Sequence, residues 1–171
     1  CIHQPPAGIG APASPDLDAV SPNLMHRLVY RNFPGDHEAL LASHAVFSGA
    51  TSGARWYEIR NPSAAAPTVF QQQTFAPDPS FRFMSSAAMD QLGNIALGYN
   101  ISNSTSVFPG IGLTGRAAGD PLNTMGAELT VQLGAGAMVA PSPNWGTFNN
   151  LTADPADDCP FWYTSEYMAV S

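Results

Sequence analysis

The feature that most constrains the fold of this chain is an internal repeat. Residues 81–99 align with residues 145–163 without a gap, so that Asp154 falls 64 residues after Asp90. In both copies an aromatic residue opens the segment, an aspartate divides it and a tyrosine closes it. Such a repeat is typical of architectures in which one small unit of secondary structure stacks on the next.

Each copy of the repeat is predicted to be a β-hairpin. The first strand ends at Asp90 or Asp154, whose short side chain can bind backbone N–H groups two residues later and hold a tight turn. Gly93 in one copy, and Asp157 and Asp158 in the other, are residue types that tolerate a positive φ. The chain then returns as a second strand.

A weaker similarity relates residues 56–62 to residues 112–118. This alignment places Arg60 and Arg116 at corresponding positions, each at the end of a predicted third strand. Its offset is 56 residues, so loop lengths differ between the copies.

Beyond Leu24, short hydrophobic runs alternate at a period of two and are separated by turn residues, which is typical of β-strands. No segment carries a sustained helical stripe with caps, so helix is expected to be minor. Residues 37–47 are predicted to be an inner strand, with one or two helical turns as the alternative, and residues 68–75 an exposed edge strand. The ten predicted strands span residues 27–32, 37–47, 55–60, 68–75, 81–90, 93–102, 111–116, 128–133, 145–154 and 160–168.

Four strands repeated at a period of roughly 60 residues are typical of a β-propeller, whose blades stack their faces on one another. The sequence predicts a proline-rich extended arm over residues 1–23, then propeller-like blades over residues 24–171. The blades are placed at about residues 24–76 and 80–134, with a partial blade at 145–168. Two and a half blades do not close a ring, so we expect self-association or upstream blades of a longer chain. The alternative is a β-sandwich in which the repeat is a chance similarity.

Charge composition argues against several partners. The chain has six arginines, no lysine and a formal net charge of −7. Because phosphate binding needs a basic stripe, this composition argues against nucleic acid and anionic membrane surfaces as ligands. No apolar run reaches the roughly 20 residues of a membrane span. The charge composition does not exclude neutral polymers or cations as ligands.

Two cysteines, Cys1 and Cys159, form an even count that is compatible with one disulfide in an exported protein. The alternative is two free thiols. A cysteine in first place is also compatible with an acylated lipoprotein.

Four further motifs are residues 1–5 (CIHQP), 24–33 (LMHRLVYRNF), 89–99 (MDQLGNIALGY) and 157–167 (DDCPFWYTSEY). Together they resemble the C-terminal region of large uncharacterised secreted bacterial proteins. The resemblance implies export to the cell surface or medium and a propeller of sialidase-type (BNR-like) repeats. It implies no established activity, so no catalytic residue is carried over. This chain reads Trp145-Gly-Thr-Phe148 where the family has Trp-Gly-Asp-Tyr.

Seven residues are candidates for ligand binding, because aromatic rings can stack on sugars and charged groups can bind their substituents. They are Trp56, Tyr57, Arg60, Arg116, Trp145, Glu166 and Tyr167. Most of the aromatic residues are instead expected to fill the core between blades.

Two polar clusters are candidate metal sites. Asp154, Asp157 and Asp158 supply oxygen ligands of the kind that Ca²⁺ prefers, although a β-turn explains them as well. Calcium is the one cofactor that the sequence leaves open. The second cluster could suit Zn²⁺ or Cu²⁺, but on a strand its two histidines point to opposite faces; its members are Asp36, His37, Glu38 and His44.

The sequence favours a non-catalytic, secreted module that binds or assembles on a polysaccharide or another cell-surface polymer. One alternative is a sialidase-like glycoside hydrolase using Tyr57 and Glu58 with Arg55 and Arg60, although adjacent strand residues face opposite ways. Another alternative is a structural fragment of a larger secreted protein. No pair of carboxylates is singled out by the sequence as catalytic.

Overall fold

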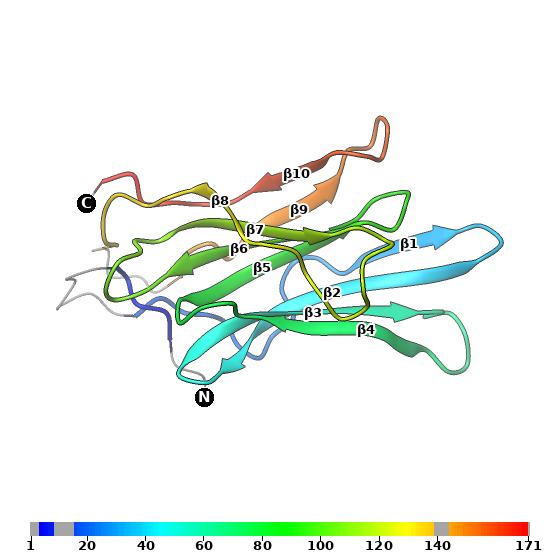
Figure 1. The fold of residues 1–171 in the computed structure, drawn as a ribbon, viewed down its shortest axis with the longest axis horizontal. Helices are drawn as coiled ribbons and strands as arrows, with labels where there is room; N and C mark the ends of the chain where they lie inside the picture. Colours follow the sequence, from blue (N-terminus) through cyan, green and yellow to red (C-terminus); the bar gives the residue numbers. More distant parts are fainter. Residues whose placement is uncertain (1–3, 9–15, 139–143, 171) are drawn as a thin grey trace.

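The computed structural model describes residues 4–8, 16–138 and 144–170, and it is all-β, as predicted (Figure 1). These residues contain ten strands and no helix. The first sheet has the order β1 (Val29–Phe33), β2 (His37–Ser48), β3 (Thr51–Arg60) and β4 (Thr68–Phe75). The second has the order β5 (Phe81–Met89), β6 (Ile95–Ser102), β7 (Gly110–Arg116) and β8 (Leu129–Gln132). β9 (Asn150–Ala153) and β10 (Phe161–Thr164) form a separate hairpin.

Every pair of neighbouring strands is antiparallel. The three ranges predicted as blades each contain one of the three sheets. The described strands do not close into a barrel or a ring.

The second sheet lies between the first sheet and the hairpin. Ala87 and Met89 of β5 pack in one cluster with Leu41 and Trp56 of the first sheet. Ala88, which points the other way, packs against Leu151 of β9. β6 is therefore buried along its whole length, and its residues read as an apolar run rather than an alternation.

The turn predicted from the repeat is confirmed in both copies. Asp90 Oδ1 accepts a hydrogen bond of 2.8 Å from the Leu92 N–H, and Asp154 Oδ1 accepts one of 2.7 Å from the Ala156 N–H. Gly93 and Asp158 adopt the positive φ values that close the turns, 83° and 56°. A local side-chain bond thus makes the two hairpins alike.

The last two strands are shorter than predicted. Residues 145–149 do not extend β9, because Gly146 has a φ of 74° and the Asn149 N–H closes a turn on the Gly146 carbonyl at 3.0 Å. Trp145 instead packs beside Phe83 in the core. The alternative of helical turns within residues 37–46 is wrong, since β2 is continuous there.

One end of the sheets is covered by the described part of the N-terminal segment. Leu17 and Ala19 are buried with Trp145, and the Leu17 N–H donates to the Pro5 carbonyl at 2.7 Å. The opposite end carries the β1–β2, β3–β4, β5–β6 and β9–β10 turns (Figure 1). We refer to this end of the molecule as the turn end.

Arg82 of β5 is fully buried between the sheets and its charge is paired. Its Nε and Nη2 donate to the two oxygens of Glu128 at 2.7 and 3.0 Å. Its Nη2 also donates to Asp78 Oδ2 at 2.9 Å, and Glu128 Oε2 accepts a further bond of 2.7 Å from Tyr99. The hydrogen bond to Arg82 lowers the pKa of Asp78 to about 2. Burial, with the Glu128 carboxylate, raises the pKa of Tyr99.

Candidate ligand pocket

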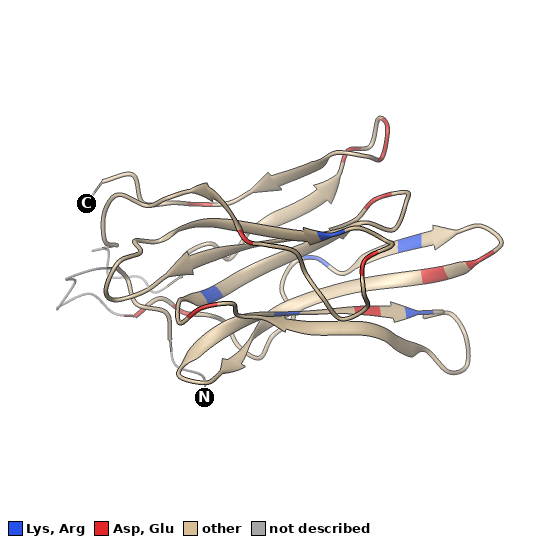
Figure 2. Ribbon diagram, viewed as in Figure 1, with Lys and Arg blue, Asp and Glu red and all other residues tan. Residues whose placement is uncertain are grey.

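A cavity of about 240 Å³ opens between the two four-stranded sheets at the turn end. Figure 2 shows that charged residues concentrate towards this end of the molecule. Apolar side chains, among them Phe33, Leu92 and Leu122, form part of the wall. The polar residues of the lining are Asp36, His37, Glu58, Arg60, Gln71 and Arg116.

Strand alternation directs both arginines into this cavity. On β3 the residues that share the inner face are Trp56, Glu58 and Arg60, and Trp56 lies in the core between the sheets. On β7, Arg116 is paired with Ile95, another core residue of the same face. The weaker repeat therefore identified two positions that meet in one pocket, although they are far apart in the chain.

β4 supplies two more lining residues, Phe70 and Gln71. Glu58 is paired with Gln71 and Ile59 with Val69, so Phe70 is an extra residue in the ladder, a β-bulge. The Arg60 guanidinium lies over the Phe70 ring, 3.2 Å from its centroid. Gln71 lies opposite Glu58 in the regular part of the ladder, and its amide donates a hydrogen bond to the Glu58 carboxylate.

Glu58 is a buried carboxylate, only 1% exposed, and its charge is paired. Arg60 Nε donates to its Oε1 at 2.7 Å. His37 Nε2 lies 3.9 Å from the same oxygen. The main role of Glu58 is therefore to neutralise the charge of Arg60.

His37 lies at the mouth of the pocket. Its ring stacks on Phe33, with the centroids 4.7 Å apart and the planes 23° apart. Its Nδ1 is 3.0 Å from Asp36 Oδ2, but the geometry does not make a hydrogen bond. The Asp36 side chain is 76% exposed, so it reaches mainly into solvent.

Arg116 is 5% exposed and forms no ion pair with a described residue. Its Nη2 donates to the Asp120 backbone carbonyl at 2.6 Å, and its Nε has no protein partner. Gln71 Oε1 and His37 Nδ1 are likewise buried without a protein hydrogen bond. Because buried polar atoms are nearly always satisfied, three of them around one cavity indicate a polar occupant.

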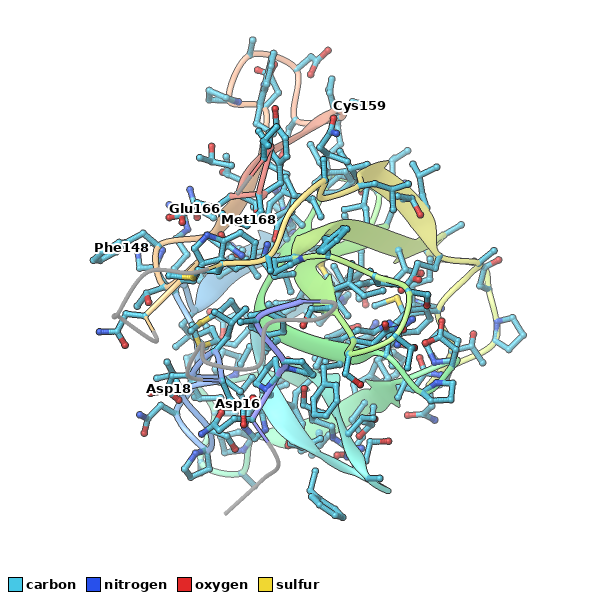
Figure 3. All side chains as sticks on the ribbon, turned by 90° about the vertical axis from the view of Figure 1, so that its left-hand side faces the viewer. Asp16, Asp18, Phe148, Cys159, Glu166 and Met168 are labelled. Atoms are coloured by element: carbon cyan, nitrogen blue, oxygen red, sulfur yellow. The ribbon has the colours of Figure 1, made fainter. Side chains whose placement is uncertain are left out.

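The other residues predicted to bind ligand lie elsewhere. Trp56 and Trp145 are buried core residues, 0% and 7% exposed. Tyr57 lies on the outer face of the first sheet, where its OH is 3.0 Å from His44 Nε2. Glu166 and Tyr167 are exposed in the C-terminal segment, and Figure 3 shows Glu166 beside Met168, in the view from the end covered by the N-terminal segment.

Sequence reasoning did not single out Gln71 and considered Glu58 and His37 only for other roles. His37 could have been found, because it shares the odd-numbered, inward row of β2 with Ala39 and Leu41. Gln71 could also have been found, because regular alternation places it on the same inward row of β4 as Phe75.

The three aspartates of the last turn each have protein partners. Asp154 Oδ2 accepts a hydrogen bond of 2.8 Å from Trp162 Nε1, and Asp157 Oδ1 accepts one of 3.2 Å from the Cys159 N–H. Asp158 forms a bidentate ion pair with Arg31 of β1, with Nη2 2.6 Å from Oδ1. The calcium site stays a prediction.

The second predicted metal cluster is divided between the two faces of β2. His37 lies in the pocket and His44 contacts Tyr57 on the outer face, as the spacing predicted. In the described part of the chain, no three His, Cys, Asp or Glu side chains are grouped as metal ligands would be.

Cys159 is exposed on the β9–β10 turn (Figure 3). Cys1 lies outside the described residues, so the predicted disulfide is not tested.

No protein-family model matches the chain, and no similar sequence was found among curated proteins and no similar fold among solved structures. The resemblance to secreted bacterial propellers is therefore still a prediction. No helix of the described residues is long and apolar enough to span a membrane.

Proposed function

We propose that the chain is a non-catalytic, secreted binding module, built from stacked propeller-like sheets, that holds one sugar unit of a polysaccharide in the pocket at the turn end. The observation that carries this proposal is the inter-sheet cavity lined by Gln71, His37 and Arg116, each of which has a buried polar atom without a protein hydrogen bond.

The lining suits a polyhydroxylated molecule. Arg116 offers donors, Gln71 Oε1 and Asp36 offer acceptors, and His37 Nδ1 offers one or the other according to its tautomer. A volume of about 240 Å³ lies below the roughly 300–1,000 Å³ of drug-sized sites. We therefore infer that one sugar ring, rather than a longer oligosaccharide, enters the cavity.

The same geometry favours binding over hydrolysis. Glycosidases need two carboxylates that flank the scissile bond, one of them free to act as nucleophile or base. Glu58 is held by Arg60 and Gln71, and Asp36 points mainly to solvent. Tyr57, the nucleophile considered from the sequence, lies on the opposite face of β3.

Replacing His37 with phenylalanine is expected to weaken saccharide binding about fivefold, because one hydrogen bond contributes about 1 kcal/mol. The phenylalanine keeps the ring stacked on Phe33. Ligands chosen from a glycan array are titrated by calorimetry. His44→Phe, on the other face of the same strand, is the matched control and should leave affinity unchanged.

If the folded wild-type protein binds no saccharide on the glycan array, the saccharide proposal is wrong. Turnover of chromogenic glycosides that disappears in Glu58→Gln would establish the hydrolase alternative instead.

The hairpin supports the assembly part of the proposal. β9–β10 corresponds to β5–β6 in the repeat, yet β6 has β7 as its second neighbour and β10 has none among the described strands. Beside the hairpin, an open depression on the second sheet is lined by Leu113, Leu129 and Phe161. We infer that strands of a second copy, or of further blades in a longer chain, complete this sheet.

The residue chosen to test self-association is Leu129, which is 60% exposed. Leu129→Lys is expected to shift a self-associated wild-type protein to the mass of one chain, because a charge on this apolar face opposes its burial. Analytical ultracentrifugation measures the mass. Thr130→Lys, whose side chain points to the other face of β8, is the control and should keep the wild-type mass. If the wild-type protein is monomeric at every concentration, it does not self-associate. Further blades of a longer chain would then be the strands that complete this sheet.

A further inference from the structure

We propose that the pocket at the turn end recognises an acidic sugar, whose carboxylate is seated against Arg116. This inference rests on the proposed saccharide function for the class of ligand. It goes further by assigning the charge of the ligand and the residue that reads it.

The charges of the pocket leave Arg116 without a counter-ion. Glu58 and Arg60 neutralise each other at 2.7 Å. Asp90 and Asp120 bind backbone N–H groups of their own turns, those of Leu92 and Ala117. Asp36 lies beside His37 with its carboxylate largely in solvent. Arg116 is thus a buried cation whose one described hydrogen bond goes to a neutral carbonyl.

A second buried arginine of the same sheet can be compared with Arg116. Arg82 is also buried and comes from the same sheet, but its guanidinium is paired with both Glu128 and Asp78. A buried charge without a partner is strongly unfavourable, and proteins normally pair it. Among the described residues Arg116 has no acidic partner, in a chain with a net charge of −7, which indicates that the partner is supplied by the ligand.

The remaining donors of Arg116 fit a carboxylate. Nη2 donates one hydrogen bond to the Asp120 carbonyl, and Nε has no protein hydrogen bond. Nε and Nη2 form one edge of the guanidinium, the edge through which Arg82 binds both oxygens of Glu128. Guanidinium groups bind carboxylates through such paired, charge-assisted hydrogen bonds. Gln71 Oε1 and His37 Nδ1 are then available for the hydroxyl groups of the same ring.

The test compares three probes on the wild-type protein by calorimetry: glucuronate, glucose and inorganic phosphate. A charge-assisted hydrogen bond is worth enough to make glucuronate bind roughly 10- to 100-fold more tightly than glucose. This preference should disappear in Arg116→Met and be partly kept in Arg116→Lys. Arg55→Met, on the outer face of β3, should retain it.

A second measurement covers the case in which Arg116→Met does not fold. In wild-type protein, the side-chain Nε–Hε NMR signal of Arg116 should shift with glucuronate and stay unchanged with glucose. Equal affinity for the two sugars, or glucuronate binding without any shift of this signal, would overturn the inference while leaving saccharide binding intact. Binding of phosphate at Arg116 without any sugar would support the anion site and count against the saccharide function. No binding of any probe would overturn both.

Discussion

Replacing Arg82 with methionine is expected to lower the free energy of unfolding by about 3–5 kcal/mol, because removing one member of a buried ion pair leaves the other charged and unpaired. Glu128, whose side chain is 19% exposed, would keep only the Tyr99 hydroxyl of its two partners. Urea denaturation followed by tryptophan fluorescence measures the loss.

The contacts of Arg82 explain why the effect should be large. Five hydrogen bonds connect it to Glu128, which directly precedes β8, and to Asp78, which lies in the loop between β4 and β5. The low pKa of Asp78, about 2, means that this carboxylate stays ionised throughout the neutral range. Arg82 also lies 5.8 Å from the centre of the Phe75 ring, so it contributes to packing between the sheets.

The double variant Arg82→Met/Glu128→Gln separates charge from packing. It removes the unpaired carboxylate, so it should be clearly more stable than Arg82→Met alone. Arg55→Met, at a partly exposed surface pair, should change stability by no more than about 0.5 kcal/mol. A loss below about 1 kcal/mol for Arg82→Met would contradict the role assigned to the cluster.

The strands and turns of this fold were predictable because their causes are local. Alternation at a period of two marked eight strands to within a few residues of their observed bounds. Asp90 and Asp154 form the same turn because each side chain binds an N–H group only two residues away. A repeat in the sequence therefore reported a repeat in backbone hydrogen bonding.

The features that were missed depend on distant contacts. Residues 145–149 have the alternation of a strand, but Asn149 instead donates to the Met84 carbonyl at 2.9 Å and to Asn100 at 2.6 Å. Satisfying these buried groups outweighs the strand preference of the segment. Similarly, nothing local distinguishes Arg82 from Arg116, because each has an aspartate four residues away, Asp78 or Asp120. Arg82 forms an ion pair with Asp78 and also with Glu128, which lies 46 residues away, whereas Arg116 bonds only the Asp120 carbonyl among the described residues.

The candidate pocket contains residues that the sequence predicted and residues that it did not. Arg60 and Arg116 were identified because the repeat placed each at the end of a third strand, and strand ends of stacked sheets meet at one edge. Trp56 and Trp145, two of the aromatic candidates, do not line this pocket, because they supply apolar area that holds the sheets together.

The second large effect is expected from Gly98→Ala, which should lower the free energy of unfolding by about 1–3 kcal/mol through overpacking. A Cβ atom at Gly98 would lie 2.5 Å from the ring of Tyr163, which packs on the second sheet from β10. The ring must move, and its hydroxyl would leave Asn149 Nδ2, now 3.3 Å away. Urea denaturation measures the loss, and hydrogen exchange should show faster exchange in β9 and β10 than in the first sheet.

The location of the exchange tests whether the hairpin is a docked unit. Leu151 and its N–H bond of 2.9 Å to Ser86 Oγ connect β9 to β5, so loss of the Tyr163 contact should loosen the hairpin first. Gly119→Ala is the matched control, because no atom lies within 4 Å of its added Cβ. If Gly98→Ala accelerates exchange equally in all sheets, the hairpin is an integral part of one cooperative core. Selective loosening instead agrees with a half-sheet held on the second sheet by few contacts, which is the state expected of a unit that other strands complete.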